Sequence, residues 1–283
     1  MSFTKPSVKL GTPRMGGDLR HTDTMEFLSP GVLIGFKAQA GGGYPTQQMK
    51  DKVNAAAIQA RNIVRIANDK LASVILLRTA ESQLMIDTFA KHYNLVAGDT
   101  AGGFLTDNTI NRPFALNRVF EHDRRWVINK IREMTLSLSA HLNTGVYLID
   151  QDKANRQVID GAVKGAQHAH YDNWVGYVHV RAGRDAICGF KNGEIHVDFT
   201  SMDGYSLNTN ACIIIHEAAH KYLGIMGDVY GCDPTYPPGL QLAGGSLENC
   251  DSLAWTAISL ATGAVRMQDY DGPDFENCPG GAL

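Results

Sequence analysis

Two histidines four residues apart, with a glutamate directly after the first, lie in the segment "IIIHEAAHKYLGIMGDVYG" at 213–231. On a helix His216 and His220 lie one above the other on the same face, so both imidazoles can reach one metal ion. The carboxylate of Glu217 can then hold a water on that metal. A zinc-bound water loses a proton near neutral pH, and a nearby carboxylate can take it. The pattern therefore predicts a site for one Zn²⁺ ion, with Glu217 as the general base of a hydrolase.

The third zinc ligand is less directly indicated. A catalytic zinc usually has three protein ligands and one open position. No histidine follows His220, so we expect a carboxylate after the helix or a residue from elsewhere in the chain. Asp228 is a candidate because Gly224 and Gly227 allow the chain to turn back sharply after the helix. Glu248, on the next expected helix, is the rival.

Together with the segments that follow it, this motif resembles a known family. HEAAH, then Asp-Val-Tyr-Gly at 228–231, then "ENCDSLAW" at 248–255, is similar to the aspzincin metallopeptidases, deuterolysin and the peptidyl-Lys metalloendopeptidases. The resemblance covers about residues 193–262. It implies zinc ligation by His216, His220 and Asp228, with Glu217 as general base and Tyr230 as a donor to the tetrahedral intermediate.

The same resemblance bears on substrate preference. It implies that Asp251 faces the S1′ pocket, where lysine-specific members bind a basic side chain. The spacing from Asp228 to Tyr230 is one residue shorter than in the family, and Ala254 stands where the family has a second acidic residue. A preference for lysine at P1′ is therefore left open.

We expect an α+β fold to position these residues, because long segments with helical periodicity come before short, β-rich segments. We expect a zincin-like metallopeptidase with long N-terminal helices, a small mixed sheet with an edge strand, the HExxH helix and a C-terminal helix. Residues 1–45 are expected to form an N-terminal arm, and residues 46–283 the zinc metallopeptidase domain. The expected helices span about 46–70, 80–94, 116–142, 209–223 and 246–264.

The segment "GEIHVDFT" at 193–200 precedes the HExxH helix closely. Zinc peptidases of this general shape pair an edge strand with the extended substrate, by β-augmentation. We expect residues 193–199 to do this here, with Ile195, His196 and Val197 as the substrate-binding residues.

Composition limits the partners and the compartment. The chain has 283 residues and a formal net charge of −3, so no bulk attraction to nucleic acid is expected. No long apolar run indicates a membrane span, and the N-terminus lacks the apolar region of a classical signal peptide. We expect a protein that is cytoplasmic as made, with export by a specialised secretion route left open. Among five cysteines, a Cys232–Cys250 disulfide and two buried thiols both remain open.

Other functions fit the same motif. The expected partner is a peptide or protein substrate, and an inhibitor or immunity-type protein is left open. The chain could instead be a zinc amidase or peptidase acting on cell-wall peptides, because the ligand geometry would be the same. It could also be a non-catalytic zinc-stabilised binding protein, whose zinc would have four protein ligands. A precursor whose arm covers the active site is a further alternative.

Overall fold

The chain divides into two compact units in the computed structural model. A sheet unit consists mainly of Met1–Ala60 and His141–Tyr222, and a helical unit mainly of Arg61–Ala140 and Leu223–Tyr270. Helices α1 (Gln47–Ile75) and α3 (Arg124–Thr144) contribute residues to both. The structure describes residues 7–9, 24–38, 41–95, 124–150, 176–177, 195–225, 227, 229–231, 235–238 and 245–267.

The sheet unit is built on a mixed sheet, as the sequence predicts. Among the described residues it has six strands, in the order β1-β2-β3-β4-β6-β5. Strands β3, β4 and β6 are parallel, whereas β1 and β2 on one side and β5 on the other add antiparallel pairs. The strands are β1 (Ser7–Lys9), β2 (Thr24–Ser29), β3 (Val32–Phe36), β4 (Val146–Asp150), β5 (Gly176–Tyr177) and β6 (Ile195–Val197).

Strand β6 is an inner strand, so the prediction of an edge strand at 193–199 is wrong. His196 lies opposite Ile149 of β4 on one side and Tyr177 of β5 on the other. All three β6 side chains, Ile195, His196 and Val197, are fully buried. Because both sides of β6 pair with neighbouring strands, its backbone has no open edge for a substrate. Among the strands that the structure describes, β5 lies at the edge on this side of the sheet.

Part of the predicted N-terminal arm lies inside the sheet. The run Val32–Phe36 forms strand β3, which pairs with β2 on one side and with β4 on the other. All five residues of β3 are buried. A strand that is apolar along its whole length is typical of a position covered on both faces. Residues 24–36 therefore contribute to the core of the sheet unit.

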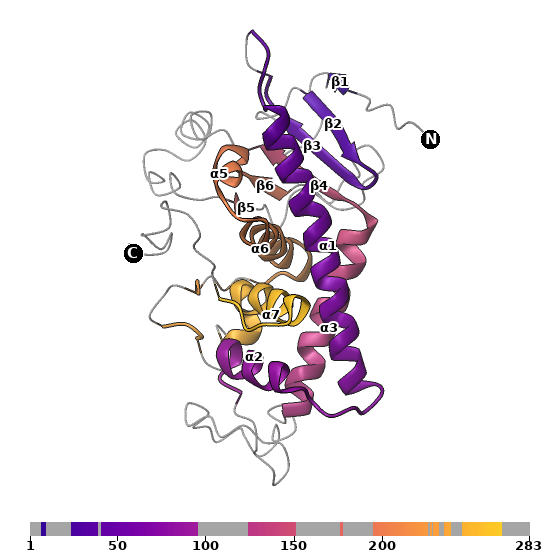
Figure 1. Ribbon diagram of the computed structural model, residues 1–283, viewed down its shortest axis with the longest axis vertical. Coiled ribbons are helices and arrows are strands. Elements are labelled where there is room, and N and C mark those ends of the chain that lie inside the picture. The colour runs from indigo at the N-terminus through magenta and orange to yellow at the C-terminus, as the bar shows by residue number, and fades with distance from the viewer. Residues whose placement is uncertain are drawn as a thin grey trace. The chain divides into compact units, whose positions relative to one another are not determined.

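The chain leaves β6 into two helices that carry the predicted site. Short α5 (Phe199–Gly204) begins at Asp198, whose side chain accepts a hydrogen bond from the Ser201 N–H. Helix α6 (Leu207–Ala218) follows and packs against β5 and β6, as Figure 1 shows. Ile214 and Ile215 of this helix are fully buried, and each contributes about 1.5–3 kcal/mol by leaving water.

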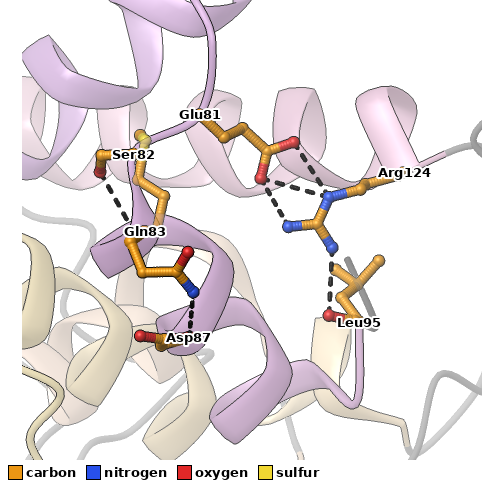
Figure 2. A network of polar contacts seen from close by, with 7 residues as sticks. Glu81, Ser82, Gln83, Asp87, Leu95 and Arg124 are labelled. Atoms are coloured by element: carbon orange, nitrogen blue, oxygen red, sulfur yellow. Dashed lines mark hydrogen bonds and ion pairs between the residues drawn. The ribbon is translucent and has the colours of Figure 1, made fainter. Parts of the chain in front are cut away.

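The helical unit contains α2 (Gln83–Tyr93), the 3₁₀ helix η6 (Ser246–Glu248) and α7 (Cys250–Thr262), with α2 packed on α7. Figure 2 shows the polar network at the start of α2. The Arg124 guanidinium donates to both carboxylate oxygens of Glu81 and, at 3.1 Å, to the Leu95 carbonyl. This arginine therefore connects the beginning and the end of α2 to the start of α3.

The predicted long helices are confirmed where the structure describes them. Thr46 caps α1, since its hydroxyl accepts the Met49 N–H at 3.2 Å. Helices α2 and α3 match the predicted helices at 80–94 and 116–142, although residues 116–123 lie outside the described part. No helix in the described part of the chain combines the length and apolar character needed to cross a membrane.

Candidate metal centre

Helix α6 positions the HExxH residues. Its N-cap is Ser206, whose hydroxyl accepts the Thr209 N–H at 3.2 Å, so the helix begins earlier than the sequence suggests. The Asn210 side chain donates at 2.7 Å to the Met202 carbonyl of α5. This buried hydrogen bond fixes α6 against the preceding helix, and His216 and Glu217 lie in its last turns.

The helix changes its geometry between the two histidines. Residues Ala219–Leu223 form a π-helix, η5, that continues directly from α6. Single π-turns inside helices are rare and are found frequently at functional sites. Gly224 follows with a φ of 70°, a left-handed conformation that ends the helix. Tyr222 of η5 stacks on His141 of α3, with ring centroids 4.7 Å apart and planes 12° apart.

The two histidines of the motif face each other. The Nε2 atoms of His216 and His220 are 3.1 Å apart, and their rings meet edge to face. Two imidazoles bound to one tetrahedral zinc, with Zn–N bonds of about 2.0–2.1 Å, have nitrogens about 3.3 Å apart. The observed separation is close to this value. A proton shared between the two nitrogens would also fit it.

Glu217 is buried beside this pair. Only 6 % of His216, 6 % of Glu217 and 9 % of His220 is exposed. A carboxylate removed from water to this extent stays charged only where polar or cationic groups surround it. A divalent cation bound by the two imidazoles would supply such a charge. The donor set of the sheet unit therefore fits a zinc ion, with two nitrogen ligands and one adjacent carboxylate.

The segment that follows the helix belongs to the helical unit. Asp228, the predicted third ligand, lies outside the described residues. Its neighbour Gly227 is held to the chain before α7: the Gly227 N–H donates to the Glu248 carbonyl at 2.9 Å, and the Cys250 N–H donates to the Gly227 carbonyl at 3.1 Å. The Cβ of any other residue at position 227 would lie 2.3 Å from the Glu248 carbonyl oxygen, so only glycine fits.

Two side chains at the start of α7 bind the next residues of this segment. The Asn249 amide accepts the Val229 N–H at 2.8 Å and donates to the Val229 carbonyl at 2.9 Å. The Asp251 carboxylate accepts the Gly231 N–H at 2.8 Å. Tyr230 lies between these two held residues and is partly exposed. Neither the residue types nor their spacing in the sequence indicate the contact of Asn249 with Val229 or that of Asp251 with Gly231.

The remaining predicted residues are placed as follows. Glu248, the rival ligand, ends η6 and is exposed at the surface. Cys250 is buried and forms no disulfide, while Cys232 lies outside the described residues. Ile195, His196 and Val197 are buried in the inner strand β6. Their predicted role in binding a substrate backbone is therefore not compatible with their position.

A different buried histidine lies in the helical unit. His92 of α2 is fully buried; its Nδ1 lies 2.6 Å from the Tyr236 hydroxyl and its Nε2 3.4 Å from the Ser259 hydroxyl. Ser259 also binds the backbone of Arg266 through its hydroxyl. Burial lowers the pKa of His92 to about 3. A neutral imidazole bound between two hydroxyls ties α2, α7 and the segment after α7 together.

Comparison with protein-family models, curated proteins and solved structures found no match to this chain.

Proposed function

We propose that this chain is a zinc metalloendopeptidase of zincin-like fold. The observation that carries the proposal is the 3.1 Å approach of the His216 and His220 Nε2 atoms, next to the buried Glu217. It is supported by the packing of α6 on a mixed sheet. The resemblance of the segments at 216–220, 228–231 and 248–255 to the aspzincins agrees with it.

Each residue of the proposed site has a defined role in the reaction. Zinc, when bound, supplies the Lewis acid that polarises the attacking water and the scissile carbonyl. Glu217 takes the proton of the attacking water and passes it to the leaving amine. Tyr230 donates a hydrogen bond to the developing oxyanion, a contact worth about 3 kcal/mol when it is well placed. The imidazoles of His216 and His220 remain neutral, because a protonated nitrogen cannot bind a metal.

The third ligand is proposed to be Asp228, the carboxylate that follows the histidine pair most closely in the chain. Two other donors belong to the segment that binds Gly227. Cys250 offers a thiol that is not in a disulfide, and zinc accepts thiolate ligands. Glu248 offers a carboxylate. Metal analysis of Asp228→Ala, Cys250→Ser and Glu248→Gln identifies the ligand, because only the variant lacking it loses zinc.

The substrate is proposed to pair with strand β5. Since β6 has a strand on both sides, the outer side of β5 is the edge, among the described strands, that lies next to α6. An extended peptide can add to such an edge through its backbone. This pairing requires little of the substrate side chains. Mapping the cleaved peptide bonds tests whether the enzyme prefers lysine at P1′.

One experiment tests the function. Wild type and Glu217→Gln are loaded with zinc, analysed for metal, and incubated with a reduced, alkylated protein substrate. We expect one zinc per chain in both, and cleavage slower by about 10²–10⁴-fold in the variant, the usual contribution of a general base. Wild type without zinc, or a Glu217→Gln protein cleaving at the full rate, would contradict the proposal. Zinc binding with cleavage of cell-wall peptides alone would favour the amidase alternative, and zinc binding without any cleavage a non-catalytic zinc-stabilised protein.

A further inference from the structure

The start of α7 holds Gly227, Val229 and Gly231. Gly227 pairs with the backbone of Glu248 and Cys250 through two hydrogen bonds. The Asn249 amide binds both backbone groups of Val229, at 2.8 and 2.9 Å, and the Asp251 carboxylate binds the Gly231 N–H at 2.8 Å. We call the side chains of Asn249 and Asp251 the α7 clamp.

Asn249 forms this contact in place of an ordinary helix cap. It occupies the N-cap position of α7, where an asparagine side chain commonly accepts an N–H from the first turn. No such capping hydrogen bond is formed. Instead the Asn249 amide oxygen is directed to Val229, and its NH₂ group binds Val229 and the Ser252 hydroxyl, the latter at 2.9 Å. The residue type favoured for capping is thus used to fix a segment 20 positions earlier.

The clamp holds both neighbours of Tyr230. Asn249 fixes the carbonyl of Val229, which forms the peptide bond before Tyr230, and Asp251 fixes the Gly231 N–H, which belongs to the peptide bond after it. A tyrosine side chain starts from the Cα between these peptides. Its orientation therefore depends on both hydrogen bonds. A misplacement of a functional group by about 1 Å can cost about 10²-fold in rate.

We propose that Asn249 and Asp251 are positioning residues for Tyr230, an inference that rests on the proposed function. Asp251 acts through its hydrogen bond to the Gly231 backbone, not by reading the substrate's charge. This differs from the role that the aspzincin resemblance implies for Asp251. The burial of Asp251 supports a positioning role, because only 4 % of the residue is exposed to solvent.

The first test is kinetic. We expect Asn249→Ala to keep its zinc and its KM within about threefold, and to lose about 10²-fold in kcat. In a Tyr230→Phe background the same substitution should change kcat less than about threefold, because the group that it positions is gone. Thr256→Val is the matched control: Thr256 is buried on the same helix. An equal loss of kcat in both backgrounds, or the same loss in Thr256→Val, would overturn the proposal.

The second test separates positioning from charge recognition at Asp251. Asp251→Asn keeps an oxygen that can accept the Gly231 N–H but removes the charge. We expect it to cleave peptides with lysine or alanine at P1′ in the wild-type ratio, and Asp251→Ala to lose kcat on both. A selective loss of lysine cleavage in Asp251→Asn would assign Asp251 to the S1′ pocket and overturn its positioning role.

A third measurement does not require activity. Hydrogen exchange should accelerate at the Val229 amide in Asn249→Ala and at the Gly231 amide in Asp251→Ala, with unchanged protection in the middle of α7. Unchanged exchange at both amides would overturn the clamp even in an active enzyme. If wild type neither binds zinc nor cleaves, the proposed function fails and the catalytic positioning with it, and faster exchange would then show a clamp that is structural only.

Discussion

The histidine pair on α6 and η5 differs from His92 on α2 in what lies opposite the ring nitrogens. His92 has a hydroxyl at each nitrogen, from Tyr236 and Ser259. Each nitrogen of this neutral ring therefore has a hydrogen-bond partner, and burial lowers the pKa of His92 to about 3. His216 and His220 instead direct one nitrogen each at the other. Either a metal ion bound by both nitrogens or the N–H of one ring donated to the other accounts for this approach.

This difference distinguishes His92 from the pair that we propose as the metal site. Burial alone does not, because His92 and the pair are all buried. What differs is the nearest partner of each ring nitrogen: His92 meets two hydroxyls, whereas His216 and His220 meet each other. The proposed metal ion would take the place of the hydrogen that one imidazole can otherwise donate to the other. The comparison predicts that removing one ring from the pair abolishes metal binding, and that removing His92 affects stability alone.

The largest expected effect distinguishes the two environments directly. His220→Ala should lose stoichiometric zinc and all peptidase activity, because a single remaining imidazole cannot hold the ion with the third ligand. His92→Gln should keep one zinc and the wild-type kcat, and lose about 1–2 kcal/mol of unfolding free energy from its buried hydrogen bonds. Metal analysis, peptidase assays and urea unfolding provide the three measurements.

Zinc removal provides the control for this pair of variants. A chelator should lower the unfolding midpoint of wild type and His92→Gln equally, since a ligand present at about 100 times its Kd contributes about 2.7 kcal/mol. The midpoint of His220→Ala should not change on chelation. A His220→Ala protein that keeps its zinc would show that the two facing nitrogens share a proton and not a metal.

The next effect is the pH dependence that His92 gives to stability. Its pKa is about 3 in the folded protein and about 6.5 in an unfolded chain, so between these values the unfolded state binds the proton and the folded state does not. The free energy of unfolding should therefore fall as the pH is lowered through this window, by up to about 1.4 kcal/mol per pH unit. Between pH 7 and pH 5 the loss due to His92 is about 2 kcal/mol.

His92→Gln isolates this contribution, because glutamine does not titrate. Urea unfolding at pH 7 and pH 5 gives the change of unfolding free energy with pH for zinc-free wild type and for His92→Gln. The difference between these two changes is due to His92, because the contributions of all other titrating groups cancel. Parallel pH profiles in the two proteins would mean that His92 has the same pKa in the folded protein as in the unfolded chain. His92 would then not be held as a neutral ring, and the contrast drawn above between His92 and the pair His216 and His220 would fail.

The pair could be predicted from the sequence because its geometry is local. Residues four apart on one helix lie on the same face whatever surrounds the helix, and His216 and His220 meet as expected. The helix start was predicted less well, since Ser206, Thr209 and Asn210 are all cap-competent and only the backbone decides between them.

The contacts between distant segments could not be predicted. Whether β6 is an inner or an edge strand depends on the strands at 146–150 and 176–177, not on its own residues. Nothing in the spacing of residue types marks the π-turn at Ala219–Leu223. The Asn249 amide binds a backbone 20 residues away, whereas its residue type indicates a helix cap. Non-local hydrogen bonds of this kind leave no periodic pattern in the sequence.

The smallest expected effect concerns the ends of the two histidine-bearing helices, both of which turn through a left-handed residue. The turn is Gly224 after the pair and Asn94 after His92, with φ values of 70° and 53°. Gly224→Ala should cost about 1 kcal/mol of unfolding free energy, because a Cβ is strained in this conformation. Asn94→Gly should change it by less than about 0.5 kcal/mol, since asparagine tolerates the turn. Gly204→Ala is the control without backbone strain, because Gly204 has no positive φ and an added Cβ there would meet nothing within 4 Å. Urea unfolding measures all three, and a loss of zinc in Gly224→Ala would show that the approach of the two imidazoles depends on how the helix ends.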